Sequence, residues 1–301
     1  YLTSVLFYYI LRYMRKNILY ILFIGCLGLY ALPSLSEEAV YTKSDSLNVI
    51  RLLHQAHVMK NKPDCWMLYF GKKFIGVPYV GGVLDGTDDE KLIVNLRQLD
   101  CTTFVEYILA LSQCAAHGQT KWKNFLYELR NIRYIGGNVA YTKRQHYFTI
   151  WINDNVKDGL VSDIQLPDPP FSAKQRISIN YMSTHISSYK MLSRHPSWWK
   201  GIRQLESSVN GQVYRYIPKE KIANTRLLRQ TIHDGDIIVI ITDKKGLDTS
   251  HIGIACWHKD GLHMLNASSI HHHVVEESMT LFRYMQHHSS QLGIRIARPL
   301  Y

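Results

Sequence analysis

The stretch RQLDCTTFVEYILAL, residues 97 to 111, places a cysteine where a polar segment ends and an apolar helix is expected to begin. Its apolar residues recur at helical spacing: Phe104, Val105, Ile108, Leu109 and Leu111. Asp100 can cap this helix, although Thr103 and Glu106 also have capping-box spacing and leave the first turn open. A helix start carries unpaired N–H groups and partial positive charge, which lower the pKa of a thiol placed there. Cys101 is therefore either a nucleophile or, as for most isolated cysteines, a small residue that packs at a helix start.

A nucleophilic thiolate needs a base, and the segment SHIGIACW, residues 250 to 257, supplies His251. Alternation along a strand puts His251, Gly253 and Ala255 on one face. Because glycine and alanine are small, they leave room beside the imidazole. The sequence therefore favours neither reading of His251 over the other, whether as a functional residue or as an ordinary strand histidine.

The base in turn needs an orienting partner, for which Asn266 in LNASS is the first candidate. A two-residue turn at Asp260-Gly261 would pair Ala255 with Asn266. That register leaves Asn266 too far along the strand from His251 for a hydrogen bond, so a bulge or a strong bend would be required. The rival orienting residues are Asp248, His258, His263 and Ser268.

The order of the expected elements along the chain predicts an α+β fold. Helices are expected near residues 47–56, 64–73, 101–111 and 122–130, and strands in the segments HDGDIIVIIT, SHIGIACW, KDGLHMLNASS and GIRIARPL. Residues 131–230 are rich in aromatic and turn-forming residues. We interpret a region of about 115–230 as an elaborated insertion that lies over the core without long elements of its own. Residues 37–301 are then one domain.

The first 36 residues are interpreted as a targeting segment. Arg15 and Lys16 precede the apolar run Ile18 to Leu32, and Ser34-Leu35-Ser36 offers small residues for cleavage. Met14 is a plausible translation start. A cleaved signal is favoured over an uncleaved anchor or a lipid anchor at Cys26, and the anchors would associate the protein with the membrane. All three predict export to the periplasm or cell envelope.

The 301-residue chain carries a formal charge of +11, from 35 basic and 24 acidic residues. Such an excess can attract an anionic polymer or be only a solvated face. The sequence has no long Lys/Arg run and no nucleic-acid-binding signature, so nucleic acid is not an expected partner. The five cysteines fit no zinc-ribbon spacing. In an exported protein Cys65 and Cys114 are the most acceptable disulfide pair, and buried free thiols are the alternative.

Four groups of residues, in this order, resemble the N-acetylmuramoyl-L-alanine amidase-like family, which are papain-fold cell-wall hydrolases of the NlpC superfamily. They are FIGVPYVGG with LDCTTFVEYILAL, RQHYFTIWINDN, DGDIIVIIT with GLDTSHIGIA, and LNASS. The resemblance covers about residues 60 to 300. It implies a papain-like, NlpC-type fold in which a helical part, with the nucleophile at a helix start, packs on an antiparallel sheet. It also implies that Cys101 is the nucleophile, His251 the general base and Asn266 the third polar position, where relatives commonly have histidine.

The resemblance further implies a reaction and a substrate: hydrolysis of the amide between the lactyl group of N-acetylmuramic acid and L-alanine, in muropeptides that include anhydro-muramyl ones. Tyr79 matches the tyrosine that superfamily members carry ahead of the nucleophile. In the family's R-x-H-Y segment, Arg144 and His146 are expected at the substrate, the guanidinium at a peptide carboxylate, and Tyr147 at a sugar face. The remaining residues expected at the substrate flank the nucleophile and the base: Asp100, Thr102, Thr103 and Ser250. No cofactor or metal is implied, and a monomer is expected.

Three alternatives stay open on the sequence. The same apparatus could cleave the γ-D-glutamyl–diaminopimelate bond of the stem peptide. The protein could instead bind peptidoglycan without catalysis, although the presence of Cys101 and His251 argues against that. A zinc amidase is prompted by the histidine runs at 271–273 and 287–288, but adjacent strand histidines point to opposite faces and no His-Glu-x-x-His helix exists.

Overall fold

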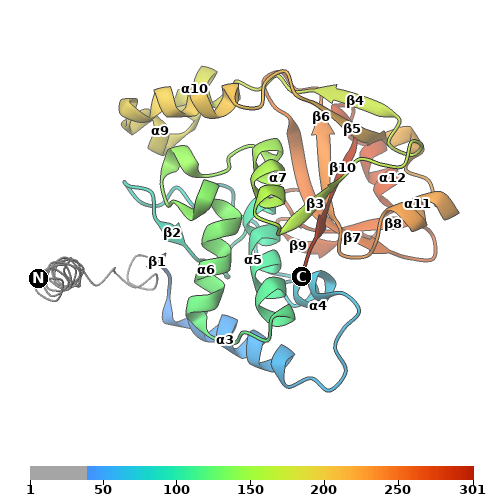
Figure 1. Ribbon diagram of the computed structural model, residues 1–301, viewed down its shortest axis with the longest axis horizontal. Helices are drawn as coiled ribbons and strands as arrows, with labels where there is room; N and C mark the ends of the chain where they lie inside the picture. Colours follow the sequence, from blue (N-terminus) through green and yellow to red (C-terminus); the bar gives the residue numbers. More distant parts are fainter. Residues whose placement is uncertain (1–38) are drawn as a thin grey trace, which may run out of the picture. The chain divides into compact units, whose positions relative to one another are not determined.

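The computed structural model describes residues 39–301, and the proposed targeting segment 1–36 lies outside them. A helical part and an antiparallel sheet lie side by side (Figure 1), which confirms the α+β class. The helical part comprises α3 (Lys43–His57), α4 (Trp66–Lys72), α5 (Cys101–Ala116) and α6 (Trp122–Arg133). Strands β1 (Ala39–Val40), which precedes α3, and β2 (Leu92–Ile93), which precedes α5, form a short parallel pair. Among the described residues, no helix is both long enough and apolar enough to cross a membrane.

Two helix starts differ from the sequence prediction. Helix α3 begins after Thr42, whose side chain forms a capping box with Asp45, rather than near residue 47. Helix α4 begins after Cys65, whose sulfur accepts the Leu68 N–H and so caps the helix. Cys65, Cys101, Cys114 and Cys256 are all free thiols, so the pairing of Cys65 with Cys114 does not form.

Seven strands follow one another across the sheet in the order β4-β5-β10-β6-β7-β8-β9, and β3 pairs with another part of β10. Their bounds are β3 (Val161–Ile164), β4 (Ala173–Arg176), β5 (Val213–Pro218), β6 (Ile237–Thr242), β7 (Thr249–Trp257), β8 (Leu262–Ser268), β9 (His273–Glu276) and β10 (Gln291–Pro299). Neighbouring strands of this sheet are antiparallel. Every residue of β6 is buried, because both faces of the sheet are covered.

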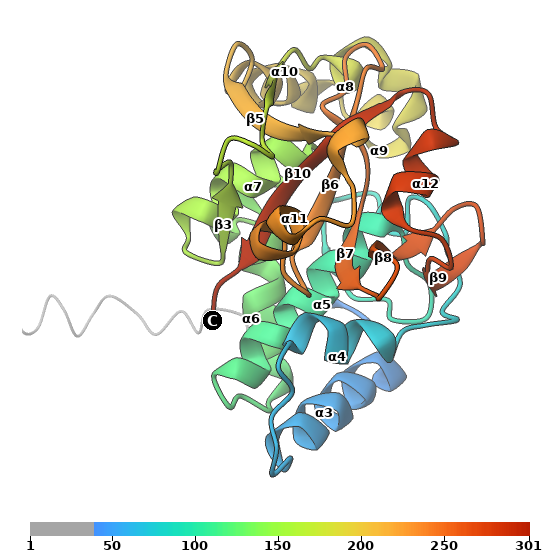
Figure 2. The ribbon, with the colours of Figure 1, turned by 90° about the vertical axis from the view of Figure 1, so that its right-hand side faces the viewer.

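One face of the sheet packs on the helical part, where Ile254 and Leu265 approach Gly71 of α4. The other face carries a hydrophobic cluster that includes Ile238, Ile240 and Met264. Helices α11 (Arg226–Thr231) and α12 (Leu281–Gln286) cover that cluster and lie toward the viewer in Figure 2. The sheet therefore holds strand β7, with His251, between two packed layers.

The region of about 115–230 contains regular helices and strands, so the expected irregularity is wrong, while its assignment as an insertion stays a prediction. Its helices are α7 (Phe148–Lys157), α8 (Tyr181–Thr184), α9 (Lys190–Arg194) and α10 (Trp199–Ser207). Five single 3-10 turns lie within the same region: Ile135–Gly137, Tyr141–Lys143, Ile186–Ser188, Pro196–Trp198 and Lys219–Lys221. Strands β3, β4 and β5 of this region extend the main sheet instead of lying over it. The aromatic residues build a second hydrophobic cluster around Ile202 and Leu205.

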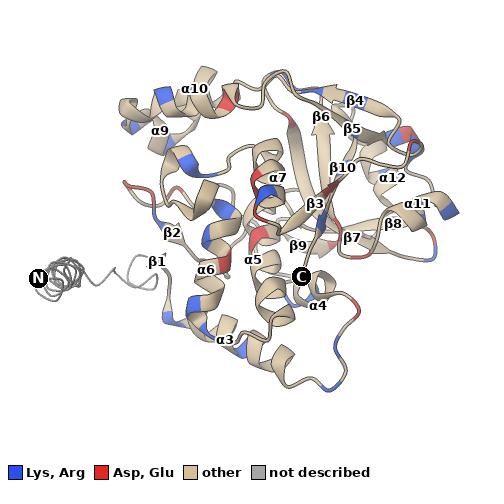
Figure 3. Ribbon diagram, in the orientation of Figure 1, with Lys and Arg blue, Asp and Glu red and all other residues tan. Residues whose placement is uncertain are grey.

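Lysine and arginine residues are distributed over α3, α6, α9, α10, β4 and α11 (Figure 3). They form no single stripe along one element of the described chain. This distribution fits a solvated basic surface better than a track for a polyanion.

Candidate active site

Asp100 and Thr103 set the start of helix α5 by a reciprocal cap. The Asp100 carboxylate accepts the Thr103 N–H at 2.8 Å, and the Asp100 N–H donates to the Thr103 hydroxyl at 3.0 Å. Cys101 is consequently the first residue of the helix. Glu106 takes no part in the cap, because it forms a buried ion pair with Arg133 at 2.7 Å. Thr103 is fully buried and its hydroxyl serves the cap, so it does not face a substrate.

The thiol of Cys101 meets strand β7 beside the histidine. The backbone N–H of Ile252, the residue after His251, lies near the sulfur and acts to lower the thiol pKa, as do the backbone and the hydroxyl of Thr102. Burial and the negative charge of Asp100 outweigh these donors and raise the pKa of Cys101 to about 12. The expectation of a lowered pKa from the helix start is therefore wrong for the free site, because desolvation dominates.

His251 is held by a chain of hydrogen bonds. Its Nε2 lies 2.9 Å from Oδ1 of Asn266, and Nδ2 of Asn266 donates to Oε1 of Glu277 at 3.0 Å. A carboxylate only accepts, so the Asn266 NH2 faces Glu277 and its Oδ1 faces His251. Nε2 therefore carries the ring proton, and Nδ1 is left as the free base. Burial lowers the pKa of His251, against the raising effects of Asn266 and Glu277.

The hairpin between β7 and β8 brings Asn266 to His251 without the bulge that the sequence argument required there. Its loop spans residues 258–261, so Trp257 pairs with Leu262 and Ile254 with Leu265. The expected pairing of Ala255 with Asn266 is therefore wrong. Asn266 lies beside Gly253: a Cβ added to Gly253 would lie 3.0 Å from the Cβ of Asn266. The amide is thus within diagonal reach of His251 on the same face.

A bulge does occur, but on the other side of β7. His251 pairs with Ile240, whereas the next pair is Thr249 with Ile241, which leaves Ser250 unpaired. Ser250 is exposed at this point. The bulge therefore presents Ser250 to solvent next to the histidine.

A cavity of about 150 Å³ opens beside the start of α5, and its lining includes Asp100, Thr102, Arg144 and His146. Tyr79 also lies close to the nucleophile: burial and the nearby Cys101 and Asp100 raise its pKa to about 12. Four of the predicted substrate residues thus line this cavity, and a fifth, Tyr79, lies near the thiol.

The charges at this cavity are already paired in part. Arg144 contacts Asp85 at 2.7 Å and Glu90 at 3.5 Å. His146 is half-buried, its Nε2 lies 2.8 Å from the Tyr141 carbonyl, and loss of solvation holds its pKa well below the usual value. Tyr147 is buried in the second hydrophobic cluster, with its hydroxyl donated to Glu206, and does not offer its ring to a sugar.

The rival orienting residues have partners elsewhere. The buried carboxylate of Asp248 accepts the Thr149 N–H at 2.7 Å. His263 contacts Asp260 and the Glu277 carbonyl, and Ser268 accepts the His271 N–H. Glu277, which the sequence argument missed, joins the chain behind His251 and Asn266, and its second oxygen contacts Nε2 of His271 at 3.2 Å. Its sole sequence signal is an acid just after the strand that follows Asn266.

Comparison with solved structures gives the fold a class. The model resembles crystal structures of an N-acetylmuramoyl-L-alanine amidase from Bacteroides uniformis, with 34% sequence identity, a TM-score of 0.73, and coverage of 78% of this chain and 98% of that one. A protein of Bacteroides fragilis proposed to be a xylanase is 38% identical with a TM-score of 0.71, covering 77% and 99%. A Legionella pneumophila protein at 22% identity shares the fold, with a TM-score of 0.66 and coverage of 86% and 95%.

The family follows from the sequence match. The model of the N-acetylmuramoyl-L-alanine amidase-like family matches residues 69–294, and the chain belongs to that family. Among curated proteins, none matches this sequence. The matched range includes Cys101, His251, Asn266 and Glu277.

Proposed function

We propose that the protein is a cysteine amidase of the papain-like, NlpC type that hydrolyses the N-acetylmuramoyl-L-alanine bond of muropeptides. The family supports the amidase activity. The observation that carries the cysteine mechanism is the 2.9 Å hydrogen bond between Nε2 of His251 and Oδ1 of Asn266, on a strand whose Ile252 N–H lies close enough to the Cys101 sulfur to lower the thiol pKa. Such a group of nucleophile, base and orienting amide is what thiol catalysis requires.

In the proposed first half-reaction, the thiol proton passes to Nδ1 of His251 as sulfur attacks the lactyl carbonyl. The carbonyl carbon becomes tetrahedral and its oxygen anionic. The Cys101 N–H, which the cap at Asp100 leaves unpaired within the described residues, is available to stabilise that oxyanion. The Tyr79 hydroxyl, protonated because its pKa is raised to about 12, is a second candidate donor.

In the second half-reaction, protonated His251 gives its proton to the leaving L-alanine nitrogen, the C–N bond breaks, and a thioester remains on Cys101. Water then adds its oxygen to the thioester carbonyl while His251 accepts a water proton. Collapse of this intermediate breaks the C–S bond and returns the proton to sulfur. The cycle consumes one water and releases a free carboxylic acid and a free amine.

The pKa directions describe the resting pair. Burial raises the pKa of Cys101 to about 12 and lowers that of His251, so both groups are neutral before substrate binds. Proton transfer is then coupled to attack instead of preceding it. The free base is available at neutral pH because the imidazole stays unprotonated.

Glycan hydrolysis, as proposed for the Bacteroides fragilis relative, fits the cavity less well. Glycosidases use two carboxyl groups, one of them free to donate a proton. In this cavity Asp100 caps α5, Glu106 pairs with Arg133, and Asp85 pairs with Arg144. The acids are therefore committed to structural contacts.

Peptidoglycan lies outside the cytoplasm, so this function needs export, and we propose that residues 1–36 direct it. The proposed partners are muropeptides. The neutralised Arg144 would have to exchange Asp85 or Glu90 for a substrate carboxylate in order to bind it.

The test is mass spectrometry of purified muropeptides, including anhydro-muramyl tetrapeptide, incubated with the 301-residue chain. We expect release of a peptide with a free L-alanine amine, and loss of that product with Cys101→Ala. Cys65→Ala is the matched control, since that thiol caps α4 and should leave the rate unchanged. Cleavage within the stem peptide would reassign the protein as an endopeptidase, and no cleavage by the unsubstituted chain would favour a binding protein.

A further inference from the structure

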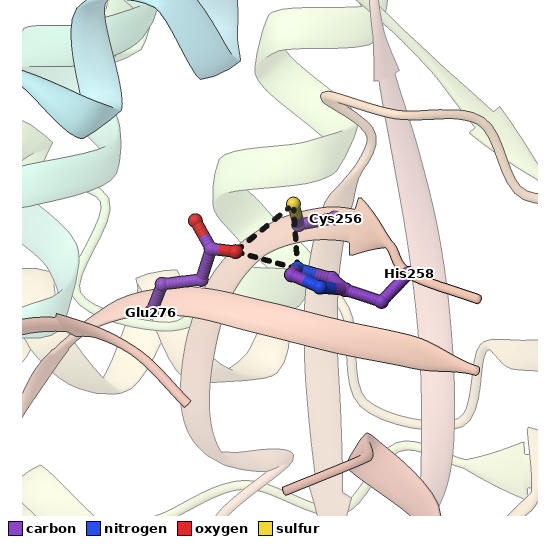
Figure 4. A group of neighbouring side chains, drawn as sticks. All are labelled: Cys256, His258 and Glu276. Atoms are coloured by element: carbon purple, nitrogen blue, oxygen red, sulfur yellow. Dashed lines mark hydrogen bonds and ion pairs between the residues drawn. The ribbon is translucent and has the colours of Figure 1, made fainter. Parts of the chain in front are cut away.

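A second cluster of reactive side chains lies at the far end of strand β7. It consists of Cys256 near the end of β7, His258 in the loop before β8, and Glu276 at the end of β9 (Figure 4). The Cys256 sulfur lies 3.6 Å from Nε2 of His258 and 3.6 Å from Oε1 of Glu276. Nε2 of His258 and Oε1 of Glu276 are 2.5 Å apart. The three atoms converge on one point between three chain segments.

The distances resemble those around a tetrahedral metal ion. Zinc bonds sulfur at about 2.3 Å and nitrogen or oxygen at about 2.0–2.2 Å, which puts sulfur about 3.5 Å from its neighbouring ligand atoms. Only Nε2 of His258 and Oε1 of Glu276, now joined by a hydrogen bond, lie too close together to be ligands of one ion. These two atoms must move apart to admit it. His258 is 42% exposed, so its ring has room to move.

The carboxylate at this point is held by a partner of its own. Lys72 of α4 contacts the second oxygen of Glu276 at 3.3 Å, which leaves Oε1 directed at Cys256 and His258. Outer contacts of this kind orient a metal-binding carboxylate. The cysteine is nearly buried, whereas the imidazole is open to solvent and offers an entry path.

We propose that Cys256, His258 and Glu276 bind a divalent transition-metal ion, with zinc the best match to a sulfur, nitrogen and oxygen donor set. Thiolate and carboxylate together neutralise a doubly charged ion, and the fourth position is open to water. A thiol binds such an ion as the thiolate, so binding releases the Cys256 proton.

This site is separate from the candidate active site. His251 and Cys256 lie on the same strand, about 17 Å apart at 3.3 Å per residue. Glu276 directly precedes Glu277, the carboxylate behind Asn266. A bound ion would tie the end of β9 to the β7–β8 loop and so hold the backbone that carries Glu277. The role inferred for the metal is structural.

The test uses cobalt as a spectroscopic probe of the 301-residue chain carrying Cys26→Ser and Cys101→Ala, which removes two other thiols that could contribute a signal. We expect one equivalent of Co²⁺ to produce a sulfur-to-cobalt charge-transfer band, and Zn²⁺ to abolish it by competition. Cys256→Ser should remove the band, while Cys65→Ala, the matched control, should keep it.

Glu276→Gln and His258→Gln keep the sulfur and test the other two ligands. We expect each to weaken Zn²⁺ binding, in competition against Co²⁺, by at least the roughly 10–100-fold that loss of an outer contact costs. If Cys256→Ser fails to fold, His258→Gln, which replaces an exposed residue, still tests whether these side chains bind the ion. No band in the parent chain, or a band that survives both Cys256→Ser and His258→Gln, would overturn the proposal.

Discussion

The amide of Asn266 has a single favourable orientation because its two neighbours differ in kind. Glu277 can only accept a hydrogen bond, so it draws the NH2 group and turns the carbonyl oxygen toward His251. Glu277 is 3% exposed, which strengthens that preference. A neutral amide thus does what a charged orienting residue would do, and the negative charge is placed one step further from the imidazole.

Replacing Glu277 tests this positioning role. In Glu277→Leu the Asn266 amide can flip, the His251 ring loses its fixed tautomer, and we expect kcat to fall by about 10²-fold with little change in KM. Glu277→Gln can still accept from Asn266 through its own oxygen and should recover most of the rate. The measurement is steady-state kinetics on the muropeptide that the unsubstituted chain cleaves.

The pH profile separates this role from simple loss of structure. The charge of Glu277 raises the pKa of His251, so both substitutions should lower that pKa and move the acid limb of kcat/KM to lower pH. An unshifted limb in both variants would contradict the proposed coupling.

Among single residues, the sequence could indicate only those whose role is marked by their immediate neighbours in the chain. Cys101 follows a capping acid at a helix start, and His251 stands among small residues on a strand. Glu277 could not be predicted, because its contact with Asn266 depends on the pairing of Asn266 with Val275 across β8 and β9. The depth of burial at the thiol, and hence the direction of its pKa shift, likewise depends on packing that distant segments supply.

Among the elements, the β7–β8 hairpin determines whether the candidate site can form. An Asp-Gly pair predicts a two-residue turn of type I′, which needs positive φ at both central residues. His272 is the only non-glycine with positive φ among the described residues, so Asp260 does not adopt that geometry. The four-residue loop shifts the register by two residues, a change that keeps every side chain on its predicted face. The face alternation of His251 could thus be predicted correctly while the pairing could not.

Gly253→Ala tests the register at its tightest point. An added Cβ would lie 2.5 Å from Cγ of Met264 and 3.0 Å from Cβ of Asn266, so β8 must move away from β7. We expect a loss of about 1–3 kcal/mol in the free energy of unfolding, together with weaker catalysis. Urea denaturation measures the first. Gly86→Ala is the control because its Cβ would meet no atom within 4 Å, and an equal loss there would contradict the steric argument.

A buried ion pair joins α5 and α6. Glu106 and Arg133 are 2% and 1% exposed, and Arg133 also donates to the Ile93 carbonyl at 2.8 Å. Glu106→Gln leaves the guanidinium without its counter-charge, and we expect about 3–5 kcal/mol of destabilisation in urea. The double variant Glu106→Leu with Arg133→Met removes both charges and should be markedly more stable than the single one. A single variant as stable as the unsubstituted chain would show that the pair is not needed.

Across the whole molecule, the region of about 115–230 shows where sequence reasoning fails. Its strands are short and pair with segments far along the chain, as β3 does with β10, so no local periodicity marks them. The aromatic residues that looked like an irregular cover are the core of a second cluster. Composition correctly excluded disorder there, but the continuity of the sheet could not be inferred from it.

Two half-buried histidines with lowered pKa values make the entire fold sensitive to acid. Burial lowers the pKa of His251 and holds that of His146 well below its usual 6.5. A depressed histidine pKa means that the unfolded chain binds more protons below pH 6.5, so this stability is present above that pH and is lost as pH falls toward the folded values. Each proton that the unfolded chain binds and the folded chain does not lowers the free energy of unfolding by up to about 1.4 kcal/mol per pH unit.

His146→Gln isolates one of these protons, because glutamine can still donate to the Tyr141 carbonyl that His146 contacts. We expect the unsubstituted chain to lose stability in urea between pH 6.5 and 5.5, and the variant to lose less by up to about 1.4 kcal/mol. Buried acids such as Glu106, whose pKa is raised by burial, take up protons in the folded state and act in the opposite direction, equally in both proteins. His54→Gln, at an exposed position on α3, should keep the full pH dependence. If His146→Gln keeps it too, the His146 ring is protonated in the folded protein and its burial does not hold it neutral.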